Sequence, residues 1–525
     1  MAFGLVNGQD PPDADYVLDA LLRYNYLPMQ RKRREELPPI FSSATFLPEA
    51  AMLLNQCKSR GAGYDAVEYR LTRFNGISRI LSIPHPLAYA QLSYCIYAHW
   101  KWLQSVMFSD VSQIVPRRHR DKRLIIMDYE MGIDKNCRKT EKSIGAHYMV
   151  STDITNFFPS IYSHTVAWVL LTPEVAKAQR AADEAHWPNV LDLKLRQCKR
   201  GETQGVAIGP ATSNIIAELI LDDVDGKMAK RGSWKFERFL DDYTAYCSSE
   251  DEANHFIRCL GEELSRYNLM LNARKTVITA LPCSFVPTWT TRLTDLPARK
   301  TGSVENELDR FTAIKYLDLA MSMAKEEPDE SVLKYALKTL FSHALCPQAQ
   351  TDVLPYALGL CFHQPALLST LGRLFLQMPS TALLAYQRQL NDLVRDNAAS
   401  HRSDGMCWAL YYMIELKVPI DSESAESIVA SGDCLGLLLL YLSEVKDYQN
   451  MVLRFVSKIG PDNYDLDQYW ILLYQLFRDG KIQNPYPNED VFQILKEHGV
   501  TFVDETTTID SAFKLIPFSS EEEAS

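Results

Sequence analysis

Residues 238–246 read RFLDDYTAY and place two adjacent aspartates between residues typical of strands. The flanking stretches 235–240 and 243–249 are short and rich in aromatic and β-branched residues, so the sequence predicts a β-hairpin with Asp241 and Asp242 at its tip. Neighbouring side chains on a strand point to opposite faces, so at most one of the two carboxylates can face a core. Because a buried carboxylate without a partner is costly, the pair marks either an exposed turn or a cation site.

A third aspartate follows another predicted strand. The stretch HYMVSTDI at 147–154 has strand character and places Asp153 near its end. A lone aspartate in this position usually forms a turn or caps a helix. Three carboxylates at the ends of two neighbouring strands would repel one another, and Mg²⁺, which prefers oxygen ligands, would relieve that repulsion. The spacing alone leaves both interpretations open.

The front half of the chain mixes strands with helices. Residues 211–228 and 251–267 carry apolar side chains at helical spacing between and after the predicted strands. This pattern predicts an α+β fold for the first 290 residues. A polar stretch at 290–310 indicates a junction.

The rear half is predicted to be helical. Apolar residues recur at i, i+3 and i+4 in the stretches 331–345, 382–394, 467–480 and 488–500. In the last stretch Asn488 can cap the start of the helix, and Gly499 stands where a left-handed residue ends it. Helices of similar length with short polar breaks suggest a stacked, solenoid-like domain. No period is clear enough to name a repeat.

The composition is that of a soluble globular protein. The chain has 525 residues, 46% of them hydrophobic and 23% charged. Its 11 cysteines form no C-x-x-C pair, which favours reduced thiols in a cytosol. The first residues lack the order of a signal peptide, and the longest apolar run, at 434–442, is too short to span a bilayer. We therefore expect a cytoplasmic protein without a membrane partner.

The formal net charge of −11 is unevenly distributed, because its negative part lies after residue 300. The front half is slightly basic and contains four basic clusters, at 31–36, 116–123, 135–142 and 194–201. Each cluster alone is usually a solvated surface. Together they make a groove that follows nucleic-acid phosphates plausible.

Five stretches in the first 285 residues resemble the motifs of reverse transcriptases, in the expected order. DITNFFPSIY from Asp153 is similar to the first catalytic motif, and QGVAIGPATSNIIAELIL at 204–221 to the second. RFLDDY resembles the Y-x-D-D motif with Phe239 in place of the tyrosine. NLMLNARKT at 268–276 is similar to the following motif, and SRILSIPHPLAYAQLSYCI at 78–96 to a segment of the fingers of retron and group II intron enzymes.

The resemblance implies a fingers-palm polymerase fold and a role for each matching residue. Asp153, Asp241 and Asp242 would hold two Mg²⁺ ions, for which Mn²⁺ could substitute, and the carbonyl of Ile154 would complete a metal shell. The resemblance also implies four further roles: Phe158 blocks a ribose 2′-hydroxyl, Gln204 and Gly205 contact template and incoming nucleotide, Arg79 binds the triphosphate and Lys275 orients or protonates the leaving pyrophosphate. Without the motifs, Phe158 is an ordinary core aromatic and Arg79 a surface ion-pair partner.

No recognisable thumb follows the palm, and the chain continues into the acidic helical half. This combination resembles the abortive-infection and defence-associated bacterial reverse transcriptases, the AbiK-like group. The resemblance implies HEAT-like helical repeats in place of the thumb, homo-oligomers and an antiphage role. It also implies DNA synthesis from dNTPs, with the product attached to a tyrosine in some members and an associated non-coding RNA in others.

These inferences divide the chain into five expected parts. The expected divisions are an N-terminal and fingers region at 1–105, a palm at 106–290, a junction at 291–310, an α-helical repeat domain at 311–515 and an acidic disordered tail at 516–525.

Two alternative functions belong to other classes. RDNAASH at 395–401 matches the loose R-x4–6-H pattern of HEPN ribonucleases, although Arg395 is more simply a cation near a helix end. A catalytically inactive scaffold that binds nucleic acid is the other alternative. The retention of all three carboxylates argues against the scaffold.

Overall fold

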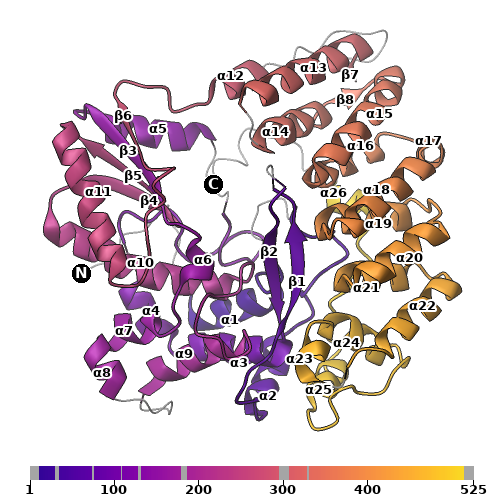
Figure 1. The fold of residues 1–525 in the computed structure, drawn as a ribbon, viewed down its shortest axis with the longest axis horizontal. Helices are drawn as coiled ribbons and strands as arrows, with labels where there is room; N and C mark the ends of the chain where they lie inside the picture. Colours follow the sequence, from indigo (N-terminus) through magenta and orange to yellow (C-terminus); the bar gives the residue numbers. More distant parts are fainter. Residues whose placement is uncertain are drawn as a thin grey trace.

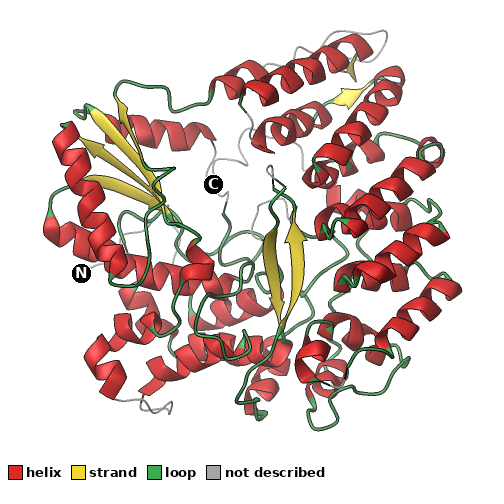
Figure 2. Ribbon diagram, viewed as in Figure 1, coloured by secondary structure: helices red, strands yellow, loops and turns green. Residues whose placement is uncertain are grey.

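The computed structural model describes residues 11–29, 35–73, 76–107, 109–127, 132–178, 186–294, 307–327, 330–460 and 462–513. A four-stranded sheet lies at one side of the molecule, a two-stranded ribbon lies near its centre, and helices occupy the other side (Figures 1 and 2). Among the described residues, no helix has both the length and the apolar character needed to cross a bilayer.

The four-stranded sheet contains the strands predicted around the aspartates. It consists of β3 (Tyr148–Asp153), β4 (Lys235–Phe239), β5 (Asp242–Cys247) and β6 (Val277–Ala280). The strands run antiparallel in the order β4-β5-β3-β6. The hairpin β4–β5 and the strand β3 are therefore confirmed as neighbours in one sheet.

One face of this sheet is covered by two long helices, α10 (Ala211–Arg231) and α11 (Glu250–Ser265). Both match the helices expected at 211–228 and 251–267. The side chain of Ser249 caps α11 by accepting a hydrogen bond from the N–H of Glu252. The chain order β3-α10-β4-β5-α11-β6 is the split βαβ arrangement, which places both helices on the same face.

The opposite face of the sheet carries α5 (Gly132–Ser143). This helix has no buried residue and is held to β4 by ion pairs from Arg138 and Lys142 to Glu237. In Figure 1 it lies beside β3, β5 and β6, away from α10. One face of the sheet therefore packs against helices in a core, whereas the other face borders a cleft under a polar helix.

The N-terminal part combines helices with a two-stranded ribbon. The ribbon pairs β1 (Ala66–Leu71) with β2 (Arg79–Pro84) in antiparallel register. Among the described residues, four helices precede α5 in sequence, α1 (Ala14–Arg23), α2 (Pro48–Gln56), α3 (Pro86–Ala98) and α4 (Trp100–Val106). Four more connect β3 to α10, namely α6 (Phe157–Ser160), α7 (Thr165–Leu171), α8 (Pro173–Ala178) and α9 (Trp187–Gln197).

The rear half is helical almost throughout. Its first helices are α12 (Thr288–Thr294), α13 (Arg310–Glu326), α14 (Glu330–Phe341), α15 (Pro347–His363), the 3₁₀ helix η2 (Pro365–Thr370), α16 (Gly372–Leu376), α17 (Ser380–Leu384) and α18 (Gln387–Ala399). The remaining helices are α19 (Ser403–Glu415), α20 (Ser422–Ser431), α21 (Cys434–Leu442), α22 (Lys446–Val456), α23 (Asn463–Asp467), α24 (Trp470–Arg478), α25 (Val491–Glu497) and α26 (Ile509–Phe513).

Three details of the predicted rear half are wrong. The region is not purely helical, because β7 (Glu307–Leu308) pairs in parallel with β8 (Ala344–Leu345) where two extended connections meet. The stretch 382–394 is divided between α17 and α18. The last predicted helix starts later than expected, with Asp490 and not Asn488 before its first residue, whereas Gly499 has the expected positive φ of 66°. The expected tail at 516–525 lies outside the described residues.

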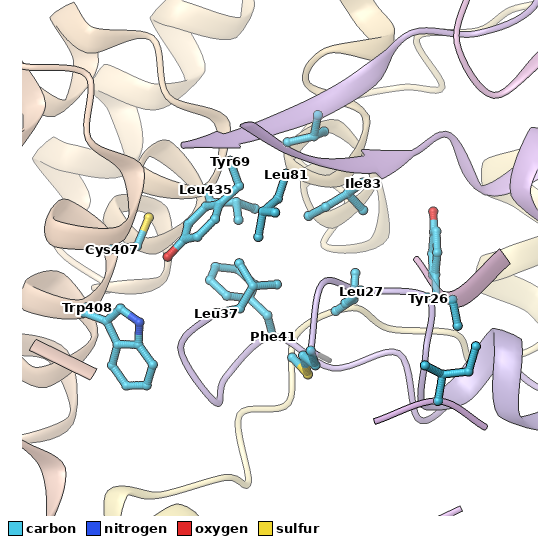
Figure 3. Close-up of a cluster of buried hydrophobic side chains, with 14 of the residues drawn as sticks. Tyr26, Leu27, Leu37, Phe41, Tyr69, Leu81, Ile83, Cys407, Trp408 and Leu435 are labelled. Atoms are coloured by element: carbon cyan, nitrogen blue, oxygen red, sulfur yellow. The ribbon is translucent and has the colours of Figure 1, made fainter. Parts of the chain in front are cut away.

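The helical half packs directly on the N-terminal part. Trp470 of α24 stacks near Tyr26, with ring centroids 6.2 Å apart, and its indole N–H donates to the carbonyl of Ile83 at 3.1 Å. Arg60 forms an ion pair of 2.7 Å with the buried Asp467. Figure 3 shows side chains from the N-terminal segments, from β1 and β2, and from α19 and α21 in one cluster. Residues far apart in sequence therefore share one hydrophobic core.

Candidate active site

The hairpin tip is a two-residue turn. Phe239 pairs with Asp242 across β4 and β5, which leaves Leu240 and Asp241 as the turn residues. Leu240 has a φ of 55°, a conformation that costs a non-glycine residue about 1 kcal/mol or more. Its side chain is buried, which helps to hold this conformation. The turn therefore fixes the direction of both aspartates.

The sheet register brings the three carboxylates to one place. Asp153 at the end of β3 lies directly opposite Asp242 at the start of β5, so both side chains stand on the same face. The N–H of Ile154 donates to the backbone carbonyl of Asp241 at 3.2 Å, which attaches the turn to the end of β3. We call Asp153, Asp241 and Asp242 the carboxylate triad.

Alternation along the strands places Asp153 and Asp242 on the face away from α10 and α11. Val150 and Ala245, which pair with each other, are fully buried on the helix-covered face. Ser151 and Asp153 alternate with them, so they line the cleft under α5 together with Asp242. The paired aspartates therefore face the cleft and not the core.

The triad is electrostatically strained. The pKa of Asp241 is raised to about 6, mainly by burial and also by the charges of Asp242 and Asp153, while Arg79 opposes the shift. Burial and the charge of Asp153 likewise raise the pKa of Asp242, against the opposing effect of Lys275. Such shifts are typical of functional sites and show that negative charge here exceeds what the surrounding residues neutralise.

Lys275 is the ion-pair partner of the triad. Its ammonium group donates to the Oδ2 atom of Asp153, and this contact raises the pKa of Lys275. The position of the lysine depends on the chain that follows α11, where the N–H of Asn272 donates to the carbonyl of Asp153 at 2.8 Å. The structure therefore places the lysine of the fourth motif beside the aspartate of the first.

The triad has the donor chemistry for divalent cations. The Oδ1 atom of Asp153 is buried and has no hydrogen-bond partner within the described residues. No group of three or more histidine, cysteine, aspartate or glutamate side chains in the described ranges is already arranged around a metal position. An unpartnered carboxylate oxygen among mutually repelling carboxylates nevertheless fits a hard cation with oxygen ligands, and the carbonyl of Ile154 lies next to it in sequence.

A buried charge network supports the hairpin from the helix-covered side. Arg238 is fully buried and donates to Glu218 at 2.8 Å, to Asp225 at 2.8 Å and to the carbonyl of Leu240 at 3.0 Å. Tyr243 donates its hydroxyl to Asp225 at 3.0 Å. We call Arg238, Glu218, Asp225 and Tyr243 the buried charge network. Glu218 and Asp225 are seven residues apart and so lie on one face of α10, a spacing that could have indicated the network from the sequence.

The loop of the second motif packs against the first. The N–H of Gly205 donates to the carbonyl of Ile161 at 2.7 Å, and the side-chain amide of Gln204 donates to the carbonyl of Pro159 at 3.1 Å. Gly205 has a φ of 81°, and an added Cβ would lie 3.1 Å from the oxygen of Pro159. This close approach explains why the position requires glycine.

The two remaining site candidates differ in position. Arg79 begins β2 and lies close enough to lower the pKa of Asp241, so it belongs to the surroundings of the triad. Phe158 is buried, with its ring centroid 5.4 Å from that of Phe157, and its carbonyl accepts the N–H of Val206 at 3.0 Å. The structure thus places Phe158 in the core, between the two motifs.

Of the four basic clusters, the one at 135–142 lies on α5 and faces the triad. In the cluster at 116–123, Arg123 is buried and bound to Asp121, and at 194–201 Arg200 pairs with Asp65. Residues 31–34 lie outside the described residues. The position of α5 over the triad depends on tertiary packing, so the sequence indicated the charge of this cluster but not its location.

The arginine of the ribonuclease alternative is engaged in ion pairs. Arg395 forms ion pairs with Asp421 at 2.7 Å and with Asp392. His401 is exposed at the turn after α18 and has a φ of 50°. The guanidinium therefore serves an ion-pair arrangement between α18 and the start of α20.

Comparison with known proteins identifies the domain that holds the triad. Residues 99–317 match the family model described as reverse transcriptase (RNA-dependent DNA polymerase), and this range contains the triad and Lys275. No curated protein matches the chain.

Solved structures of telomerase show a distant likeness. Apo telomerase from Candida tropicalis truncated from its C-terminal domain has 14% identity and a TM-score of 0.26, over 44% of this chain and 52% of that chain. Telomerase from Candida albicans in complex with a TWJ fragment of telomeric RNA has 11% identity and a TM-score of 0.28, over 78% and 66%. Apo telomerase from Candida tropicalis has 12% identity and a TM-score of 0.28, over 77% and 69%.

The chain spans about half the length of the first of these structures, and at such scores the likeness carries no conclusion. The matched range includes the strands and the turn that carry the triad. The chain therefore contains a domain, within residues 99–317, that matches the reverse transcriptase family.

Proposed function

We propose that this chain is a DNA polymerase of reverse-transcriptase type that joins dNTPs by two-metal nucleotidyl transfer. Asp153, Asp241 and Asp242 would hold Mg²⁺, or Mn²⁺ as a substitute, with the carbonyl of Ile154 as a further ligand. Two such cations stabilise the attacking and leaving oxygens of an in-line phosphoryl displacement.

The observation that carries the proposal is that Asp153 and Asp242 face the open cleft, with Asp241 next to them in the hairpin turn. The pairing of Asp153 with Asp242 and the bond from Ile154 to Asp241 concentrate negative charge where one lysine forms the ion pair. A folded protein gains nothing from such repulsion by itself, so the arrangement favours a bound cation.

The reaction then needs an attacking hydroxyl, a proton donor and a group that binds the triphosphate. A 3′-hydroxyl, or a tyrosine hydroxyl at initiation, attacks the α-phosphate of the dNTP, and the bond to pyrophosphate breaks. Lys275, which lies beside the triad, is placed to donate a proton to the leaving pyrophosphate. Arg79 would bind the triphosphate through its guanidinium, because this group can donate two hydrogen bonds to phosphate oxygens.

We assign nucleotide selection to residues of the first two motifs. We assign Phe158 the exclusion of the ribose 2′-hydroxyl, and Gln204 and Gly205 the contact with template and incoming nucleotide. The close packing of the two motifs, through Gly205 and Ile161, supports a shared surface for the nucleotide.

The test is incorporation of labelled dNTPs by the full chain. The protein is incubated with Mg²⁺ and either no template or an RNA template, and the product is resolved on a denaturing gel. We expect incorporation that stops when EDTA is added. Absence of incorporation under every template condition, with Mg²⁺ or Mn²⁺, would contradict the proposal.

We further propose that the chain acts in antiphage defence in the bacterial cytoplasm as an AbiK-like homo-oligomer. Support comes from the order of the parts, since a palm at 106–290 and a junction at 291–310 lead into the helices of 311–515. Several helices that follow one another in sequence are in contact, namely α13 with α14, α18 with α19, α20 with α21, α21 with α22 and α24 with α25, which favours HEAT-like repeats. Phage plating on cells with the wild-type chain or an Asp153→Asn variant tests the role, because equal plaque counts would refute it.

In this proposal the DNA product remains attached to a tyrosine of the chain, and a bound non-coding RNA is the alternative source of a template. Treatment of denatured product with proteinase separates the two cases. Product that enters the gel only after proteinase treatment supports attachment, whereas free product that requires co-purified RNA supports a template.

A further inference from the structure

Four cationic side chains stand along one face of α5. Lys135, Arg138, Lys139 and Lys142 are spaced at i, i+3, i+4 and i+7, so they lie on a single side of the helix. The cleft under α5 is lined by the first three of them and by Asp153, Asp242 and Lys275. The basic face of α5 is therefore turned towards the open face of the sheet.

The four cations have different partners. Arg138 and Lys142 both form ion pairs with Glu237 of β4, and these contacts fix the helix to the sheet. Within the described residues, neither Lys135 nor Lys139 forms an ion pair with a carboxylate. Burial lowers the pKa of Lys139, and the charge of Lys135 lowers it further. Two lysines thus point into the cleft without a neutralising group of their own.

Cations bound by the triad would favour binding of an anion by these lysines. The carboxylates that now attract Lys135 and Lys139 across the cleft would then be neutralised, and the lysines would face positive charge. A phosphate group between them relieves the repulsion, because it accepts hydrogen bonds from both lysines.

The remainder of the cleft suits a nucleotide. The ring of Phe239 lies 5.3 Å from the ammonium group of Lys135, and Ser151 and Thr244 add hydroxyl groups. An aromatic ring beside cations is the usual combination in sites that bind single strands, where the base stacks and the phosphate pairs with a cation. Stacking on this ring needs an unpaired base, so we expect the cleft to favour a single strand over a duplex.

We infer that the cleft under α5 binds the end of the single DNA strand that the enzyme extends, with Lys135 and Lys139 on its phosphates and Phe239 against a base. The inference rests on the proposed polymerase function and adds a site to it. It assigns the fingers-side cation Arg79 to the triphosphate and the α5 lysines to the growing strand. A strand held this way has its end beside the triad.

The test measures binding of a fluorescent single-stranded oligodeoxynucleotide to the full chain, at a constant Mg²⁺ concentration and without dNTP, over a series of salt concentrations. In the Lys135→Ala, Lys139→Ala double variant we expect affinity to fall about tenfold. The slope of log affinity against log salt should fall by about 1.4, because each phosphate contact with a single strand contributes roughly 0.7. Alanine favours helix, so the variant retains α5.

Two controls isolate the site. Replacement of the exposed Lys446 and Lys458 by alanine removes the same charge from the helical half and should leave binding unchanged. Replacement of Lys135 and Lys139 by arginine keeps the charge and should restore binding. A blunt duplex of the same sequence should compete at least tenfold more weakly than the single strand.

Three results would overturn the inference: no binding by the unmodified chain, equal affinity and salt slope in the double variant, or equal competition by the duplex. Because the assay contains no dNTP, it is independent of synthesis. A chain that binds through α5 but makes no DNA would refute the polymerase proposal alone, and a chain that makes DNA but binds without these lysines would refute this inference alone.

Discussion

Buried carboxylates have different partners on the two faces of the four-stranded sheet. On the helix-covered face, Glu218 and Asp225 share the guanidinium of Arg238, which also binds a backbone carbonyl of the hairpin turn. On the open face, the carboxylate triad has Lys275 as its ion-pair partner, and one oxygen of Asp153 has no hydrogen-bond partner in the described part of the chain.

The charged groups on the helix-covered face therefore stabilise the fold, whereas those on the open face belong to the candidate active site. Every carboxylate oxygen of the buried charge network accepts a hydrogen bond from the protein, so the network holds the hairpin whether or not a ligand is present. The negative charge of the triad is not fully neutralised within the protein, so the stability of this region depends on a bound cation. The following changes test the contrast, in order of decreasing effect.

Asp241→Asn should abolish nucleotide incorporation. The amide keeps the shape of the side chain but removes a metal-binding charge, and we expect a loss of at least about a thousandfold, roughly 4 kcal/mol in the barrier. Incorporation of labelled dNTP measures the effect, and a thermal melt checks that the variant remains folded. Asp251→Asn, at an exposed site on α11, is the matched control and should retain activity.

Arg238→Gln should destabilise the fold. Removal of the guanidinium leaves Glu218 and Asp225 buried without a counter-ion, which costs about 3–5 kcal/mol in the free energy of unfolding. Urea unfolding at neutral pH measures the loss. A triple variant with Arg238→Met, Glu218→Gln and Asp225→Asn should regain most of it, and failure to regain any would show that the network acts through something other than charge.

Mg²⁺ should stabilise the wild-type chain against heat. Binding to the folded state at 100 times the dissociation constant adds about 2.7 kcal/mol, because the unfolded chain lacks the site. Thermal melts with Mg²⁺ and with EDTA measure this gain. The gain should disappear in Asp241→Asn and persist in Arg238→Lys, and an equal gain in all three chains would place the cation elsewhere.

A smaller effect should appear in the pH dependence of stability without metal. Because the pKa of Asp241 is about 6 when folded and lower when unfolded, the folded chain binds more protons between these values. The free energy of unfolding therefore decreases as pH rises through this range. From pH 5 to pH 7, the wild type should lose about 1 kcal/mol relative to Asp241→Asn. Parallel pH profiles of the two chains would contradict the raised pKa.

The sequence predicted the parts of the site that local patterns encode. The strands around Asp153 and Asp241 are short and apolar in alternation, and their ends meet because one hairpin pairs with one neighbouring strand. The helices α10 and α11 also follow from local spacing. The strained φ of Leu240 was not predicted, because leucine gives no local signal for a left-handed turn.

The parts that were missed depend on contacts between distant segments. The basic cluster of α5 was visible, but its place over the triad is set by ion pairs to Glu237, about a hundred residues away. The same holds for the packing of α24 on the N-terminal part, which joins Trp470 to Ile83. Hydrophobic spacing identifies a helix but does not identify its partner.

The ribbon β1–β2 belongs to both halves of the molecule, because α19, α21 and α24 contact β1. The same ribbon carries Arg79 at one end and buries Tyr69, Leu81 and Ile83 in the shared core. A shortened chain that ends at residue 309 would expose these side chains to water, so we expect it to be insoluble when expressed alone. The polymerase half therefore does not fold independently of the helical half. A related chain without these helices would need other residues to bury the apolar side chains of the ribbon.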